Sequence, residues 1–312
     1  MTRTARLKAY AKLNLGLRVL YKRPDGYHEI RTVFQTISLA DDLEVDFAPA
    51  RETAIEIHGT PEIPDNLVER AARAVLGHLG IEARVVFRLK KRIPSGAGLG
   101  GGSSDAAAVL LALPVLAGKA IVPGELHAMA TQLGSDVPFF LHGGAALGLG
   151  RGEELYPLPD RRRIKALLVA PKVHSNTAEA YRDLSPRLTT IPLQNKLVSF
   201  QQEVWGAGDG SKVSLCNDFE DGVFARYPEL RRVADRLIRG GASPVAMTGS
   251  GSSIFGIFPD RERLLRARKA FSGEQTFAIS FVSRSQYRSA WRRALKLHVK
   301  GDQWPPRSRY AR

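Results

Sequence analysis

Apolar and polar positions alternate along several segments of the chain, and this alternation predicts β-strands. The alternation is loose over residues 4–20 and regular over 43–47 and 54–58. Residues 164–170 are almost all apolar, which is typical of a buried strand. The predicted strands are residues 4–20, 43–47, 54–58, 84–90, 164–170, 244–248, 253–258 and 276–283.

Other segments space their apolar residues as one face of a helix does. In the first of these, Asp65 or Asn66 can cap the start of the helix and Gly80 its end. The apolar run from Ser104 predicts a second helix, which Pro114 is expected to kink or end. The predicted helices are residues 66–80, the run from 104, 123–133, 217–225, 228–239 and 260–271. Because strands and helices do not alternate strictly, the predicted fold class is α+β, with a domain boundary near residues 158–163.

The 312 residues suffice for one large domain or two ordinary ones. The single cysteine, Cys216, excludes an internal disulfide and a cysteine-rich zinc site. The longest uncharged apolar run, residues 106–118, is too short to span a membrane, and basic residues interrupt any secretion signal within residues 1–20. We therefore expect a cytoplasmic protein that contacts no membrane.

The net charge of +15 is concentrated near the end of the chain, where residues 284–312 carry nine basic residues and one acidic residue. Such a segment either contacts nucleic acid or acidic lipid, or forms a solvated helix and tail. We favour the solvated helix and tail, because most charged runs are of this kind. The remaining positive charge suits a protein that handles anionic small molecules.

A glycine-rich segment, PSGAGLGGGSS at residues 94–104, lies between a predicted strand and a predicted helix. Glycines let backbone N–H groups converge on an anion, and a helix N-terminus adds partial positive charge, so we expect a phosphate site. Ser103 and Ser104 could add hydroxyls to the phosphate or help to hold a metal ion. The chain lacks the acidic residue of a dinucleotide-binding motif, the Gly-Lys-Ser/Thr of a P-loop, and the protein-kinase motifs.

Polar residues also interrupt two apolar segments. Lys12 and Asn14 share one face of a predicted strand, and Asp136 is flanked by apolar residues. Lys12 could instead extend to solvent, and Asp136 could be a turn or cap residue. If Lys12 and Asp136 meet in space, they can deprotonate a hydroxyl and stabilise the developing charge. A second glycine cluster, TGSG at residues 248–251, is either a hairpin turn or a second wall of the same site.

The segments AKLNLGL, PSGAGLGGGSSDAA, LGSDVPFF and AMTGSGSSIFGIF occur in this order and resemble the GHMP kinase superfamily over about residues 5–283. The segment RPDGYHEIRTVFQTISLADDL narrows the resemblance to the branch that acts in non-mevalonate isoprenoid synthesis. The resemblance implies phosphorylation, by ATP, of the 2-hydroxyl of 4-diphosphocytidyl-2-C-methyl-D-erythritol. It also implies a ribosomal-protein-S5-like N-terminal domain (1–160) and a ferredoxin-like C-terminal domain (161–284), with residues 285–312 as a basic tail.

The resemblance implies a role for each residue of the reaction centre. Asp136 would be the catalytic base, and Lys12 would keep it ionised and stabilise the transferring phosphoryl group. Mg²⁺ would bridge the oxygens of ATP, and no residue is assigned as a metal ligand. The residues implied to wrap the ATP phosphates are Pro94, Ser95, Gly96, Ala97, Gly98, Leu99, Gly100, Gly101, Gly102, Ser103 and Ser104.

The same resemblance implies the residues that bind the alcohol substrate. Asn14 would position it, Tyr27 would stack on the cytosine ring, and His28 would hydrogen-bond to the edge of that ring. Gly249 and Gly251 would shape the pocket. The expected partner is a cytidine diphosphate derivative, with no nucleic acid, bound by a monomer or weak homodimer.

Asp105 departs from the expected family pattern, in which a small or amide residue follows the serines, and its charge would lie close to the expected phosphates. It could help to hold Mg²⁺ through water, or favour the helix N-terminus. Three other functions stay open: a GHMP kinase for a different alcohol, a nucleic-acid-binding protein that uses the basic tail, and a sensor that binds ATP without turnover. Tyr27 and His28 argue against the first, and the complete set of phosphate-binding and catalytic residues argues against the second.

Overall fold

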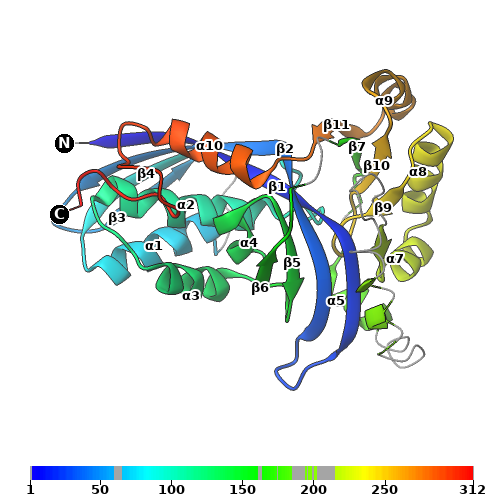
Figure 1. The fold of residues 1–312 in the computed structure, drawn as a ribbon, viewed down its shortest axis with the longest axis horizontal. Coiled ribbons are helices and arrows are strands. Elements are labelled where there is room, and N and C mark those ends of the chain that lie inside the picture. The colour runs from blue at the N-terminus through cyan, green and yellow to red at the C-terminus, as the bar shows by residue number, and fades with distance from the viewer. Residues whose placement is uncertain are drawn as a thin grey trace.

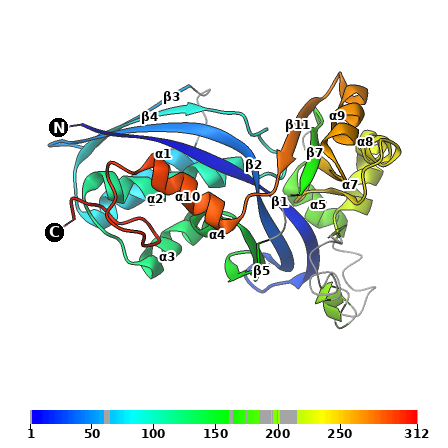
Figure 2. The same ribbon diagram turned by 45° about the horizontal axis from the view of Figure 1, so that its top comes forward.

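A computed structural model describes most of the chain, and its elements form two sheets with helices packed on their outer faces (Figure 1 and Figure 2). The described residues are 2–59, 65–160, 164–173, 175–184, 194, 196–198, 200–201 and 215–311. Part of the expected domain boundary, residues 161–163, lies outside them.

The first sheet has seven strands, in the order β3-β4-β2-β1-β8, with β5 paired to β2 and β6 paired to β5. One side is covered by helices, whose apolar residues share a core with the sheet. The strands are β1 (Arg3–Lys22), β2 (His28–Pro49), β3 (Ala54–His58), β4 (Ala83–Lys90), β5 (Ala145–Leu149), β6 (Glu154–Pro157) and β8 (Cys216–Asn217). The helices of this half are α1 (Leu67–Leu79), α2 (Gly101–Ala117), α3 (Pro123–Leu133), α4 (Val137–His142) and α10 (Arg284–Ala294).

The second sheet has four antiparallel strands in the order β11-β7-β10-β9. In chain order this is 4-1-3-2, the ferredoxin-like arrangement that the family resemblance implied. Its strands are β7 (Lys165–Ala170), β9 (Val245–Met247), β10 (Ile254–Phe258) and β11 (Gln275–Ser280). Its helical elements are α5 (Thr177–Leu184), α7 (Glu220–Arg226), α8 (Pro228–Arg239), α9 (Arg261–Arg268) and the 3₁₀ turn η2 (Lys269–Phe271).

Strand β1 runs through all three apolar cores of the molecule. Its alternate residues from Ala5 to Ala9 pack with the helices of the first half, and those from Ala11 to Leu15 pack between the two sheets. Leu17 and Val19 join the core beneath the helices of the second half. A register shift between Tyr10 and Lys12 interrupts the alternation of β1. Lys12 and Asn14 therefore face away from the core between the sheets, and Lys12 Nζ lies 5.5 Å from the centroid of the Phe34 ring in the first core.

Three predictions about individual elements need correction. Strand β2 is 22 residues long, although alternation predicted only its last part, because Val33 to Ile37 are buried on both faces. Helix α2 begins at Gly101, three residues before the predicted start. It also continues past Pro114 to Ala117, because Val115 and Leu116 are buried and hold its last turn in the core.

The basic segment after residue 283 is not a solvated helix and tail. Tyr287, Trp291 and Leu295 on and just after α10 are buried in the core of the first half. The hydroxyl of Tyr287 donates a hydrogen bond to the carbonyl oxygen of Phe140, and the indole N–H of Trp304 donates to Leu141 O at 2.9 Å. Tyr287, Trp291 and Leu295 recur every four positions, an apolar helical stripe that the surrounding arginines conceal in the sequence.

None of the helices in the described ranges is long and apolar enough to cross a membrane.

Candidate active site

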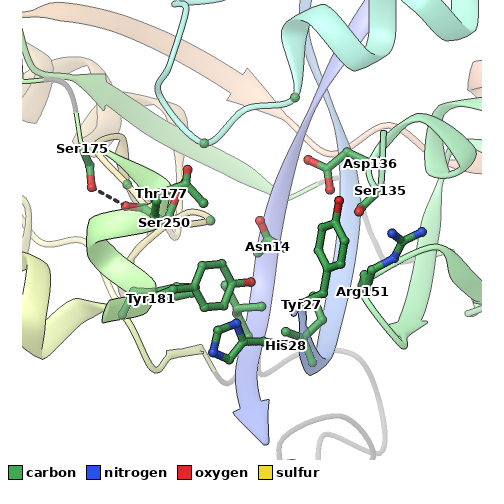
Figure 3. Close-up of a pocket in the computed structure, with 18 of the residues that line it drawn as sticks. Asn14, Tyr27, His28, Ser135, Asp136, Arg151, Ser175, Thr177, Tyr181 and Ser250 are labelled. Atoms are coloured by element: carbon green, nitrogen blue, oxygen red, sulfur yellow. Dashed lines mark hydrogen bonds between the residues drawn. The ribbon is translucent and has the colours of Figure 1, made fainter. Parts of the chain in front are cut away.

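A cavity of about 830 Å³ opens where β1, the glycine loop, α4 and α5 meet (Figure 3). Both halves of the molecule line it. It contains every catalytic and substrate-binding residue implied by the resemblance, together with part of the glycine loop. These residues are Lys12, Asn14, Tyr27, His28, Asp136, Gly249 and Gly251, with Gly96, Gly98, Gly100 and Ser103 from the loop.

Lys12 and Asp136 do meet in space. The ammonium Nζ of Lys12 lies 3.4 Å from Asp136 Oδ2, and the Lys12 side chain is 5% exposed. Asp136 immediately precedes α4, but its carboxylate makes no capping hydrogen bond to that helix and points into the cavity. Lys12 therefore does not extend to solvent, and the side chain of Asp136 does not cap the helix. The carboxylate and the ammonium therefore face the same part of the cavity.

Asn14 holds Lys12 in place. Its amide oxygen accepts a hydrogen bond from Lys12 Nζ at 2.7 Å, and its amide nitrogen donates to Thr32 Oγ1 at 2.7 Å. The backbone N–H of Asn14 donates to Thr248 Oγ1 at 3.0 Å, so the second glycine cluster is attached to β1. The amide is thus oriented by its partners, and the lysine ammonium is directed towards the cavity.

The two glycine clusters lie against each other. Gly96, Gly98 and Gly100 all have positive φ, and a Cβ on Gly98 would lie 2.2 Å from the carbonyl oxygen of Thr248. A Cβ on Gly249 would lie 3.2 Å from Gly98 Cα. Residues 248–251 are therefore a second wall of the same site, and side chains at these glycines would fill the space.

Not every residue of the predicted loop faces the cavity. The side chains of Ala97 and Leu99 are buried between the two sheets, so only their backbones are available to a ligand. The backbone N–H of Lys12 donates to Leu99 O at 3.0 Å, which fixes the loop against β1. Asp105 does not line the cavity but is buried behind the loop, beside Lys91.

Aromatic residues line the other end of the cavity. The rings of His28 and Tyr181 are stacked, and Tyr181 meets Phe219 edge to face with ring centroids 4.8 Å apart. Tyr27, which is 53% exposed, lies across the cavity from them (Figure 3). This arrangement offers flat apolar surfaces on which an aromatic ligand ring can stack.

The protonation states at this end favour neutral groups. Burial and the positive charge of Lys22 lower the pKa of His28, so the imidazole is uncharged at neutral pH. Its Nε2 is buried and has no hydrogen-bond partner among the described residues. Burial and the negative charge of Asp136 raise the pKa of Tyr181 to about 12, which keeps the phenol protonated.

The sequence did not single out Tyr181 or Arg151, yet both belong to this site. The Arg151 guanidinium lies 4.6 Å from the centroid of the Tyr27 ring, and its Nε donates to Glu153 Oε1 at 3.1 Å. A cation above an aromatic face is attracted by the ring quadrupole, so Arg151 steadies the exposed tyrosine. Both residues reach the site through contacts that are remote in sequence, so no local pattern marks them.

Comparison with known proteins gives two matching family models. Residues 66–144 match the model for the GHMP kinases N terminal domain, and residues 206–275 match the model for the GHMP kinases C terminal. A 4-diphosphocytidyl-2-C-methyl-D-erythritol kinase of Solibacter usitatus (strain Ellin6076) is 55% identical over 313 residues, covering 99% of this chain and 98% of that protein. The chain belongs to the GHMP kinases.

Other GHMP kinases extend the comparison. The protein of the same description from Moorella thermoacetica (strain ATCC 39073 / JCM 9320) is 40% identical, covering 89% of this chain and 98% of that one. A crystal structure of 4-(cytidine 5'-diphospho)-2C-methyl-D-erythritol kinase has a TM-score of 0.74 at 36% identity, with 90% of this chain and 99% of that chain covered. A mevalonate kinase structure, at 14% identity and a TM-score of 0.66 with 90% and 99% covered, shares the fold.

These relationships confirm the predicted resemblance, the α+β GHMP kinase fold and the reaction class. The chain is an ATP-dependent small-molecule kinase, a phosphotransferase that acts on an alcohol.

Proposed function

We propose that this GHMP kinase transfers the γ-phosphoryl group of ATP to the 2-hydroxyl of 4-diphosphocytidyl-2-C-methyl-D-erythritol. The observation that carries the proposal is the contact between Lys12 and Asp136 in a cavity with a glycine loop at one end and stacked aromatic rings at the other. The names of the relatives point to the same substrate.

The proposed reaction begins with a proton transfer. Asp136 takes the proton of the substrate hydroxyl, and the freed oxygen attacks the γ-phosphorus of ATP, releasing ADP. Lys12 keeps the carboxylate ionised beforehand and offsets negative charge on the transferring group. Phosphoryl transfer asks a protein mainly for positioning and charge stabilisation, which one base, one ammonium and a loop of N–H groups supply.

The glycine loop is the proposed site of the ATP phosphates. The positive φ angles of its three alternate glycines and the first turn of α2 direct backbone N–H groups towards an anion. Mg²⁺ would neutralise charge on the phosphate oxygens. The residues suit such an ion: Ser103 lines the cavity, and the Ser104 hydroxyl is buried without a partner among the described residues, so a hydroxyl oxygen is available.

The aromatic end of the cavity is the proposed site of the cytosine ring. Tyr27 and Tyr181 offer faces on which the ring stacks, and neutral His28 offers an unpartnered Nε2 to its polar edge. A GHMP kinase for a small alcohol without a nucleobase would leave these groups unused.

Measurement of ADP release by the purified chain, with ATP and Mg²⁺, tests the proposal. Release should require 4-diphosphocytidyl-2-C-methyl-D-erythritol, and Asp136→Asn should lower kcat about 10²–10⁴-fold, since general-base catalysis contributes that much. The charge-neutral variant Lys12→Met should lower kcat about 10²-fold or more through lost electrostatic stabilisation. Asp302→Asn, at a side chain that is 89% exposed, is the matched control and should retain full activity.

Two outcomes would contradict parts of the proposal. Turnover that is unaffected by Asp136→Asn would exclude this carboxylate as the base. Turnover of a different alcohol, with none of the cytidine derivative, would overturn the substrate but keep the kinase.

A further inference from the structure

Behind the glycine loop lies a buried group of three charged residues that the proposed reaction does not use. Lys91 Nζ lies 2.5 Å from Asp41 Oδ2 and 2.7 Å from Asp105 Oδ2. The carboxylate side chains of Asp41 and Asp105 are 0% and 3% exposed, and that of Lys91 is 25% exposed. None of the three lines the cavity, so they do not meet a ligand there.

These residues come from three segments that converge on the loop. Asp41 is in β2, Lys91 directly follows β4, and Asp105 is in the second turn of α2. The second oxygen of Asp41 accepts hydrogen bonds from the backbone N–H groups of Arg92 and Ile93, at 2.8 Å for Ile93. The chain that enters the glycine loop and the helix that leaves it are therefore attached to the same strand.

Lys91 is the centre of this arrangement. Its ammonium bridges the carboxylate on β2 and the carboxylate on α2, and so sets the separation between the two ends of the loop. A Cβ on Gly101 would lie 3.3 Å from Lys91 Nζ, so the first residue of α2 leaves room for the ammonium. Removing the ammonium of Lys91 would free one end of the loop from the other.

The cluster is expensive in free energy, which argues against a purely stabilising role. Two almost fully buried carboxylates share the ammonium of a lysine that is 25% exposed, and Asp105 Oδ1 has no hydrogen-bond partner among the described residues. Apolar residues at such a place commonly stabilise a fold as well or better, while buried charges can specify geometry. The geometry specified here is that of the phosphate loop.

We propose that Asp41, Lys91 and Asp105 are positioning residues that fix the two ends of the glycine loop, so that its N–H groups converge on the phosphates of ATP. The inference rests on the proposed role of residues 94–104 in binding ATP. It gives Asp105, whose charge near the phosphates had no explanation in the sequence, a role that requires contact with neither Mg²⁺ nor ATP.

The experiment measures each substrate separately in the full chain. Titration calorimetry with a non-hydrolysable ATP analogue and Mg²⁺ gives Kd, and steady-state kinetics give the KM of ATP and of the alcohol. Lys91→Met should raise the Kd and the KM for ATP about tenfold, since loss of the groups that support a site displaces it. The KM for the alcohol should stay within about twofold, because Asp136 and the aromatic residues are untouched.

A milder variant and a control separate positioning from folding. Asp105→Asn keeps an oxygen that accepts from Lys91, so it should fold and weaken ATP binding less than Lys91→Met does. Lys8→Met removes an exposed ion pair with Asp42, the neighbour of Asp41 on β2, and should leave every constant unchanged. The melting temperature of each variant reports stability independently.

The outcomes separate the two proposals. Variants that lose stability but bind the ATP analogue like the parent chain would overturn the positioning role, and an equal rise in both KM values would do the same. A parent chain that binds the analogue but does not phosphorylate the cytidine derivative would overturn the substrate, while the positioning role would still be tested by Kd. A parent chain that binds no analogue would overturn both.

Discussion

The imidazole of His28 lies flat against the phenol ring of Tyr181, with ring centroids 4.4 Å apart and ring planes 17° apart. His28 begins β2 in the first half of the molecule, whereas Tyr181 is in α5 in the second half. The stack therefore joins the two halves at the aromatic end of the cavity. A substrate that binds there meets surfaces from both.

The ring of Tyr181 should matter more than its hydroxyl. Tyr181→Ala removes the stacking face and should raise the KM for the cytidine substrate about tenfold, since base stacking on an aromatic residue contributes about 1–3 kcal/mol. Tyr181→Phe keeps the ring and should change this KM less than about twofold. Steady-state kinetics with each substrate varied would show it, and equal effects of the two variants would argue against stacking.

Gly98 should not tolerate a side chain. Its φ of +76° disfavours other residues, and an added Cβ would lie 2.2 Å from Thr248 O. We expect Gly98→Ala to lower the free energy of unfolding by about 1–3 kcal/mol and to weaken ATP binding. Gly124→Ala is the control, because nothing lies within 4 Å of its Cβ, and it should be neutral or slightly stabilising. Urea unfolding measures the stability of each variant, and nucleotide titration measures its affinity for ATP. Equal stability of the two variants would contradict the prediction for Gly98.

Stability should depend on pH through Asp105. Burial raises its pKa from 3.8 to about 7, the positive charge of Lys91 opposes the shift, and the negative charge of Asp41 adds to it. Because the folded-state pKa is the higher one, the favourable contribution is complete below about pH 4 and is lost as pH rises through 7. From pH 5.5 to 8 the parent chain should lose about 2 kcal/mol relative to Asp105→Asn. Denaturant unfolding of both proteins at each pH measures the difference, and parallel pH profiles would show that Asp105 does not titrate in this range.

The end of the chain should be needed for folding. Trp291→Ala removes a side chain that is 3% exposed and should cost about 3–5 kcal/mol, as large core truncations do. Leu297→Ala, at a residue that is 64% exposed, should change stability by less than about 0.5 kcal/mol. Thermal unfolding of the two variants measures the difference in stability. A small effect of both substitutions would show that the segment does not contribute to the core.

The sequence singled out residues that the structure gathers around one cavity, but it missed the extent of several elements. The glycines of residues 94–104 indicate that the backbone comes close to a ligand. Lys12 and Asp136 stand out because they are charged residues within apolar segments. Strand β2 was largely missed because a sheet covered on both faces loses the alternation of apolar and polar residues. Tyr181 was missed because its stacking partner, His28, is more than 150 positions away in the sequence. The burial of α10 was missed because its arginines outnumber its buried aromatic residues.

Strand β1 contributes to all three cores and also carries Lys12. A chain cut between its two sheets would leave one fragment holding a strand whose last third has nothing to pack against, and the other with a core that lacks Leu17 and Val19. The two halves therefore do not have independent cores, because both depend on residues of strand β1. Unfolding of the second half would expose Leu17 and Val19 of the strand that carries Lys12, so we expect the second half to support the catalytic end of the cavity as well as its own core.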